Sequence, residues 1–134
     1  MDTERSSQTE SPKEATTIVI VEDDLEIGVL LVESIREETP YKVLLTTHGT
    51  QALDLLQNLQ PQLIILDYRL PDMDGIEFYR RIHALKALEQ VPVLFISAEI
   101  APDFEEVAVR HLPLLSKPFE LTSLFNEIDR LLAT

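Results

Sequence analysis

The sequence predicts an α/β fold in which a doubly wound parallel sheet carries helices on both faces. Short, nearly continuous apolar runs alternate along the chain with stretches whose apolar residues recur every three or four positions. Such alternation is typical of strand–helix units around a parallel sheet. A length of 134 residues with 45% hydrophobic content suits one core and not two. The pattern therefore indicates one domain of (βα)5 type.

The chain divides at about residue 17. Residues 1–16 are polar, rich in Ser, Thr and Glu, and nearly free of large apolar side chains. That composition cannot bury enough surface to offset the conformational entropy lost on ordering. We therefore expect residues 1–16 to be a flexible tail and residues 17–134 to form the folded domain. The predicted strands are residues 18–21, 41–47, 63–66, 91–97 and 112–116.

The predicted helices lie between these strands and after the last one, and their apolar positions recur at helical spacing. The first four sets are Ile27, Leu30, Leu31 and Ile35; Ala52, Leu56 and Leu59; Tyr79, Ile82 and Leu85; and Phe104, Val107, Ala108 and His111. The last helix has the longest apolar stripe: Leu121, Leu124, Phe125, Ile128, Leu131 and Leu132. Helices of this kind would cover both faces of the sheet.

The charge and composition exclude several classes of function. The chain has 24 acidic and 11 basic residues, a formal net charge of -13, which would repel a nucleic-acid backbone. Cysteine is absent, so nothing argues for an oxidising compartment. No segment approaches the roughly 20 apolar residues of a membrane span, and the N-terminus lacks the apolar core of a signal peptide. We expect a cytoplasmic protein that binds neither nucleic acid nor membranes.

Polar side chains follow or end four of the predicted strands. Glu22 and Asp23 follow the first strand, Asp67 the third, Ser97 ends the fourth, and Lys117 follows the fifth. Ligands of an open parallel sheet bind at the carboxyl ends of its strands. Clustered carboxylates disfavour joint ionisation unless a cation lies among them, and Mg²⁺ prefers such oxygen ligands. A hydroxyl and an ammonium beside them would suit the oxygens of a phosphoryl group.

Each of these residues also has a simpler explanation. Asp23, with Glu26 three residues later, matches a helix capping box, and Asp24 is a further candidate cap. Asp67 alone would be an ordinary turn acid, and the loop after it, residues 70–75, has the Pro, Asp and Gly content of a turn. A serine at a strand end is usually a cap and a single lysine a solvated charge. Their combination at four strand ends favours one site.

Four segments carry a family resemblance, in order along the chain. They are residues 18–24 (IVIVEDD), 66–75 (LDYRLPDMDG), 96–98 (ISA) and 116–119 (SKPF). Together they resemble the motifs of the response-regulator receiver family of two-component signalling, over about residues 17–132. The resemblance implies a flavodoxin-like topology with strand order 2-1-3-4-5.

The same resemblance implies a role for each residue at the acidic cluster. Asp67 would be the phosphorylated nucleophile. Asp23 and Asp67 would bind Mg²⁺ directly, Glu22 would bind it through water, and the backbone carbonyl of Arg69 would complete the protein ligands.

The remaining site residues would handle the phosphoryl group. Ser97, supported by Ala98, would bind a phosphoryl oxygen, and Lys117 would pair with the phosphoryl group or with Asp67. The bond between Lys117 and Pro118 is commonly cis in this family, which would aim the lysine inward. The donor would be a phosphohistidine on a sensor histidine kinase or a histidine phosphotransfer protein.

The sequence departs from the family pattern at Leu114. Most receivers carry Tyr or Phe three residues before the lysine, as a ring that moves inward on phosphorylation. Residues 110–113 (RHLP) also replace the usual small-residue turn, so the output surface of the predicted fourth and fifth helices is expected to be altered. That face remains a possible homodimer interface. Arg69 and Glu99 are either an ion pair that tunes hydrolysis of the acyl phosphate or two solvated charges.

The sequence therefore predicts a single-domain response regulator, not a turnover enzyme, that signals to a downstream protein by conformational change. Three alternatives stay open: a phosphorelay intermediate, a receiver-like module that is never phosphorylated, and an aspartyl-phosphate phosphatase. The phosphatase is the least favoured, because such enzymes typically place a second acid where this chain has Arg69.

Overall fold

The computed structural model describes residues 16–98 and 112–133. Its elements are β1 (Thr17–Val21), α2 (Leu25–Glu38), β2 (Lys42–Thr46), α3 (Gly49–Leu55), β3 (Leu63–Asp67), α4 (Gly75–His83), the 3-10 turn η1 (Lys86–Leu88), β4 (Val93–Ser97), β5 (Leu114–Ser116) and α6 (Leu121–Leu132). The predicted helix around Phe104 and almost all of the predicted tail lie outside the described residues. No helix within residues 16–98 and 112–133 is long and apolar enough to cross a membrane.

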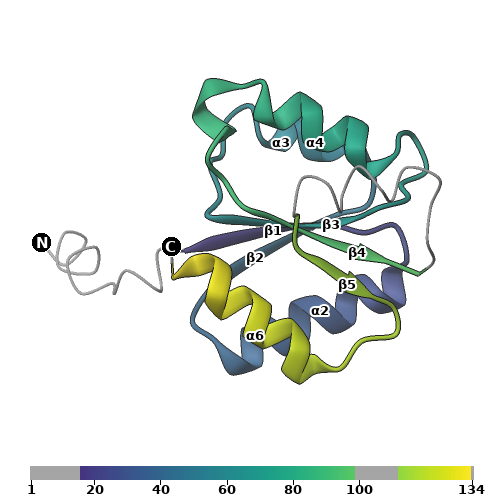
Figure 1. The fold of residues 1–134 in the computed structure, drawn as a ribbon, viewed down its shortest axis with the longest axis vertical. Coiled ribbons are helices and arrows are strands. Elements are labelled where there is room, and N and C mark those ends of the chain that lie inside the picture. The colour runs from purple at the N-terminus through teal and green to yellow at the C-terminus, as the bar shows by residue number, and fades with distance from the viewer. Residues whose placement is uncertain (1–15, 99–111, 134) are drawn as a thin grey trace, which may run out of the picture.

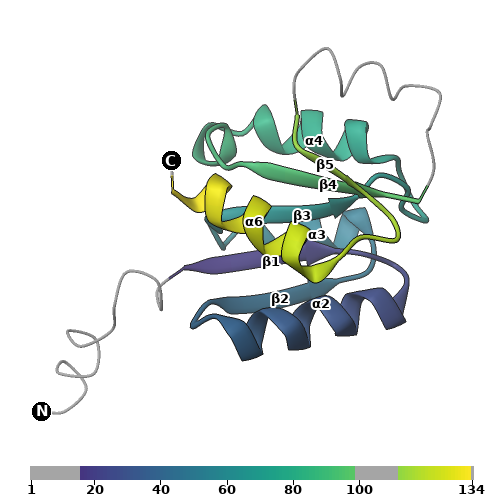
Figure 2. The same ribbon diagram turned by 60° about the horizontal axis from the view of Figure 1, so that its bottom comes forward.

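The strands form one parallel sheet in the order β2-β1-β3-β4-β5. Among the described helices, α3 and α4 cover one face and α2 and α6 the other (Figure 1). Figure 2 shows α2 and α6 along the same face. The chain turns from β1 outward to β2 and then back to β3, so the carboxyl ends of β1 and β3 flank the point where the strand order reverses. The predicted fold class and strand order are confirmed.

The core lies in two layers, one on each side of the sheet. Alternate side chains of a strand point to opposite faces, so a strand covered on both faces must be apolar throughout. The four apolar residues of β3, Leu63 to Leu66, are all 0% exposed. Side chains on the α3 and α4 side include Val19, Ile64, Leu66, Phe78 and Phe95. Those on the other side include Ile18, Ile65, Leu31, Ile35 and Ile128.

Several predicted strands and one predicted helix were too long. The predicted strands at 91–97 and 112–116 shorten to β4 and β5, because Pro92 and Pro113 have no N–H to donate to a strand ladder. The second strand loses residues 41 and 47. Helix α3 ends at Leu55, so Leu56 and Leu59 pack against the core from beyond it.

Three residues predicted to face the core do not. Leu30 is 50% exposed, Leu85 is 42% exposed and Leu121, the first residue of α6, is 38% exposed. In α2 the buried residues are Gly28, Leu31, Ser34 and Ile35, which share one helical face that excludes Leu30. Leu85 lies beyond the C-terminus of α4, where the helical period no longer applies.

Helix capping frees Asp23 for another role. The N-cap of α2 is Asp24, whose Oδ1 accepts the N–H groups of Glu26 at 3.0 Å and Ile27 at 3.4 Å. The capping box proposed for Asp23 is therefore wrong, since the helix begins one residue later. Asp74 caps α4 by accepting the Glu77 N–H at 2.8 Å.

Gly75 allows the backbone of α4 to approach the end of β3. Its N–H donates to the Tyr68 carbonyl at 2.6 Å. A Cβ atom at this position would lie 3.0 Å from the Tyr68 Cα and 3.1 Å from both the Tyr68 oxygen and Phe95 Cε1. The Tyr68 backbone is itself held by its N–H, which donates to the Ile96 carbonyl at 2.8 Å.

We expect Gly75→Ala to lower the free energy of unfolding by about 1–3 kcal/mol, because backbone atoms must shift to accept the methyl group. Urea denaturation measures the change. Gly28→Ala is the control: the three atoms nearest to its methyl group would all belong to the Leu45 side chain, the closest at 3.0 Å, and a side chain can rotate away. Alanine also gains about 1 kcal/mol of helix propensity over glycine. Equal losses in the two variants would contradict this account.

An acidic site at the carboxyl ends of the strands

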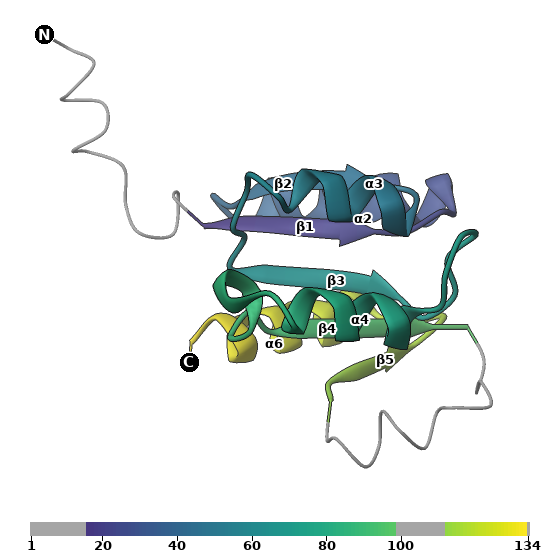
Figure 3. The same ribbon diagram turned by 90° about the horizontal axis from the view of Figure 1, so that it is seen from above.

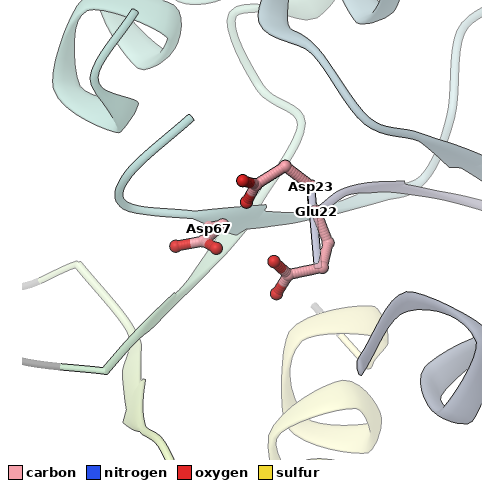
Figure 4. Close-up of side chains that lie close together, drawn as sticks. All are labelled: Glu22, Asp23 and Asp67. Carbon is pink, nitrogen blue, oxygen red and sulfur yellow. The ribbon is translucent and has the colours of Figure 1, made fainter. Parts of the chain in front are cut away.

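The fold brings the predicted site residues to one edge of the sheet. The strands run in parallel, and their carboxyl ends meet at a common edge (Figure 3). Oxygen atoms of Glu22, Asp23 and Asp67 all lie within 4.8 Å of one another. Figure 4 shows the carboxylates of Glu22 and Asp23, which follow β1, beside that of Asp67 at the end of β3. Glu22 and Asp67 are buried, whereas Asp23 is exposed.

Lys117 reaches this cluster from the end of β5. Its Nζ lies 2.9 Å from Glu22 Oε1 and 3.0 Å from Asp67 Oδ2, and its side chain is only 12% exposed. The peptide bond between Lys117 and Pro118 is cis. The Lys117 N–H donates to the Ser97 carbonyl at 2.7 Å, which places the buried Ser97 at the adjoining strand end. One ammonium group thus contacts two of the three carboxylates.

The Asp67 carboxylate is fixed through both oxygens. Oδ2 contacts Lys117, and Oδ1 accepts the backbone N–H of Arg69 at 3.0 Å. The first residues of the β3–α4 loop therefore orient the acid at the end of β3. Arg69 itself is exposed.

Burial sets the charge balance of the cluster. Desolvation, with a further contribution from nearby Asp67, raises the pKa of Glu22 to about 7, although Lys117 and the Asp24 N–H act in the opposite direction. Desolvation acts to lower the pKa of Lys117, but the carboxylates of Glu22 and Asp67 outweigh it and raise that pKa above its usual value. The lysine therefore stays charged, while the pKa of the buried glutamate lies close to neutral pH.

Three carboxylates around one ammonium leave two negative charges in excess when all four groups are ionised. Like charges at this spacing resist joint ionisation unless a cation joins them. A divalent ion with oxygen ligands would restore the balance, and Mg²⁺ commonly takes one or two carboxylates with waters and phosphate oxygens. The residues present therefore fit a Mg²⁺ site.

Comparison with known proteins decides the family. The family described as "Response regulator receiver domain" matches residues 18–129. The chain belongs to this family. The receiver is 35% identical over 117 residues to the response regulator receiver protein CpdR of Brucella abortus, covering 86% of this chain and 95% of that protein.

Two further relatives extend the comparison. Sporulation initiation phosphotransferase F of Bacillus subtilis is 30% identical to this receiver over 115 residues, covering 86% of this chain and 92% of that protein. Among solved structures, the receiver domain of the sensor histidine kinase PA1611 of Pseudomonas aeruginosa has magnesium coordinated in its active-site cleft. It is 25% identical, with a TM-score of 0.76, and the match covers 90% of this chain and 99% of that one.

Some predicted site residues remain to be placed. Ala98 and Pro118 are exposed beside the cluster, and Leu114 packs against the core on the α3 and α4 side of the sheet. Glu99 lies outside the described residues, so the choice between an ion pair with Arg69 and two solvated charges is not tested.

Two contacts of the structure were not predicted from the sequence. One is the ion pair between Lys117 and Glu22. The sequence had suggested only that Glu22 binds a metal ion through water. The other involves Asp72, whose carboxylate accepts the N–H groups of Gly49 and Thr50 at the start of α3. The sequence indicates only that α3 lacks a local cap, because His48, which precedes it, is not a capping residue type, and it does not identify Asp72 as the residue that replaces that cap.

In the absence of Mg²⁺, the folded receiver holds a proton on Glu22 that the unfolded chain releases above its ordinary pKa of 4.5. This contribution to stability is complete below that pH and is lost as the pH rises through about 7. We expect Glu22→Gln to remove a decline on the order of 2 kcal/mol from the free energy of unfolding.

Urea denaturation from pH 5 to 8, with a chelator and again with Mg²⁺, measures this decline. Added Mg²⁺ should reduce the decline in the wild-type receiver, because it stabilises the ionised carboxylates. Glu33→Gln, which alters an exposed glutamate of α2, should keep the wild-type slope. A wild-type slope in Glu22→Gln would show that Glu22 is not the group responsible.

Proposed function

We propose that this receiver accepts a phosphoryl group on Asp67 from a partner phosphohistidine, in a Mg²⁺-dependent reaction, and signals to a downstream protein by conformational change. The observation that carries this proposal is the setting of Asp67. Its carboxylate lies at a strand end, 3.0 Å from the Lys117 ammonium and within 4.8 Å of Glu22 and Asp23 oxygens. This arrangement combines a nucleophile with the groups needed to neutralise charge.

The transfer forms one bond and breaks another. A carboxylate oxygen of Asp67 bonds to phosphorus as the phosphorus–nitrogen bond of the phosphohistidine breaks, and the bonding electron pair leaves with the imidazole nitrogen. Phosphoryl transfer depends mainly on positioning and on charge stabilisation. Lys117 stabilises charge on a phosphoryl oxygen, the Arg69 N–H orients the nucleophile, and the Ser97 hydroxyl donates to the transferred group.

A metal completes the charge balance. Asp23, Asp67 and the Arg69 carbonyl would hold Mg²⁺ directly and Glu22 through water, and the ion would neutralise phosphoryl oxygens during transfer. The magnesium in the cleft of the related PA1611 receiver supports this assignment.

An apolar groove beside the site supports a protein donor. It is lined by residues that include Ile27, Leu30, Ala98, Phe119 and Leu121, and it shares Lys117 with the acidic cluster. On the adjoining turns of α2, Leu25 is 60% exposed and Val29 is 45% exposed. A protein that covers these side chains would bring its phosphohistidine to Asp67. The expected donors are a sensor histidine kinase and a histidine phosphotransfer protein.

The alternatives differ in the fate of the phosphoryl group. The name of the Bacillus relative, a phosphotransferase, supports a relay role as the second candidate. A module that is never phosphorylated draws its best support from Leu114. Turnover of phosphomonoesters is disfavoured because Arg69 stands where a phosphatase would need an acid. We further propose that residues 17–134 form the working domain, that it acts in the cytoplasm, and that neither nucleic acid nor membrane is a partner.

Incubation with acetyl phosphate and Mg²⁺ should add a single labile phosphoryl group, detected as the intact-protein mass. Asp67→Asn should abolish the adduct, because an amide oxygen cannot replace the carboxylate nucleophile, and removal of the metal should prevent its formation. Asp54→Asn, which alters an exposed acid of α3, is the matched control and should be labelled normally. An adduct that persists in Asp67→Asn would place the acceptor elsewhere.

A second prediction separates the donor surface from the chemistry. With a histidine kinase that labels the wild-type receiver, Leu30→Asp should slow transfer about tenfold, since a charge in the groove opposes apolar docking. Labelling by acetyl phosphate should not change. Leu85→Asp is the control, because Leu85 is also exposed but lies outside this groove. Loss of both reactions in Leu30→Asp would point to a damaged site, and unchanged kinase transfer would exclude the groove as the docking surface.

A further inference from the structure

The loop that follows Asp67 is tied to the start of a different helix. Asp72 Oδ1 accepts the N–H of Gly49 at 2.9 Å, and Asp72 Oδ2 accepts the N–H of Thr50 at 2.9 Å. His48, the N-cap residue of α3, makes no side-chain capping bond. Asp72 therefore caps α3 from more than twenty residues away.

A packing contact reinforces this tie. Gly49 is buried, and a Cβ atom on it would lie 2.8 Å from Met73 Sδ and 2.9 Å from Met73 Cγ. The Met73 side chain therefore fills the space that any other residue at position 49 would need. Two consecutive residues at the tip of the loop, Asp72 and Met73, thus contact the first turn of α3.

The base of the same loop lies at the acidic site. The Leu70 N–H donates to the Met73 carbonyl at 3.2 Å, and Arg69 and Asp74 form an antiparallel bridge. The Gly75 N–H closes the loop on the Tyr68 carbonyl. Residues 68–75 therefore form a closed unit, and a shift of its tip would also move the Arg69 backbone. That backbone donates its N–H to Asp67 Oδ1 at 3.0 Å.

The tie is electrostatic as well as geometric. Desolvation acts to raise the pKa of Asp72, but the hydrogen bonds from Thr50 and Gly49 outweigh it and lower the pKa to about 2. The carboxylate is ionised at any physiological pH, so its hydrogen bonds to the two N–H groups are charge-assisted.

We propose that Asp72 is a positioning residue of the acidic site. By holding the tip of the loop on α3, it holds the Arg69 backbone against Asp67, so that the Arg69 N–H orients the carboxylate and the Arg69 carbonyl meets the metal. The metal-binding part of this inference rests on the proposed function. The orientation of Asp67 by the loop does not.

The test separates the two consequences of losing Asp72, an uncapped helix and an untied loop. Asp72→Ala causes both. His48→Ser supplies a local acceptor at a position whose extended backbone (φ -135°, ψ 148°) suits an N-cap. The double variant Asp72→Ala with His48→Ser therefore regains the stability of α3 while the loop stays untied.

Calorimetric titration with Mg²⁺ is the first measurement. We expect the dissociation constant to rise roughly tenfold in Asp72→Ala and to stay raised in the double variant, as for other groups that orient metal ligands. His48→Ser alone should bind as the wild type does. Asp74→Asn is the charge control, because it removes one negative charge from the same loop and asparagine caps a helix as well as aspartate does. Recovery of Mg²⁺ affinity together with stability in the double variant would overturn the proposal.

Amide hydrogen exchange is the second measurement and needs no metal. In the double variant the amides of Arg69 and Leu70 should exchange faster than in the wild type, while those in the first turn of α3 should not. Unchanged exchange at Arg69 and Leu70 would refute the tie whatever the metal data show. If the wild-type receiver failed to bind Mg²⁺ or to be phosphorylated, the proposed function would fail, and the exchange data would still decide the role of Asp72.

Discussion

The contact of the Lys117 ammonium with Glu22 and Asp67 is the interaction on which the acidic site depends. Two carboxylates that are almost wholly shielded from water would repel each other, and desolvation raises the pKa of Glu22. The lysine offsets part of the unfavourable free energy of holding these carboxylates together. The stability of the fold offsets the remainder, because the apolar side chains of β1 and β3 are buried on both faces of the sheet. The site is therefore held together by the fold around it, and it favours an added cation.

The fold could be predicted because its central strands are visible as local patterns. A strand covered on both faces appears in the sequence as an apolar run, as residues 63–66 do. The predictions were wrong where local pattern and three-dimensional environment differ. Leu30 is apolar and has the spacing of a core residue. It is nevertheless exposed, because the orientation of α2 on the sheet determines which of its faces is buried.

The acidic cluster was also predictable, since topology alone brings the strand ends together. The bonds from Asp72 to the start of α3 were not, because they join segments more than twenty residues apart through a side chain that reads locally as a turn residue. The contact of Lys117 with Glu22 depends on side-chain reach across the sheet, and no spacing in the sequence encodes that. The sequence thus predicts which residues form the site, but it does not predict the long-range contacts that set the geometry of the site.

Helix α2 has two sides with separate constraints. Leu31 and Ile35 are packed in the core and cannot change without loss of stability, whereas Leu25, Val29 and Leu30 face outward. Substitutions at the outward positions leave the core and the acidic cluster intact. If a partner docks on these outward side chains, as we propose, two copies of such a chain could diverge in partner choice after gene duplication through these positions alone. Partner recognition would then evolve without any change in the buried residues of the acidic site.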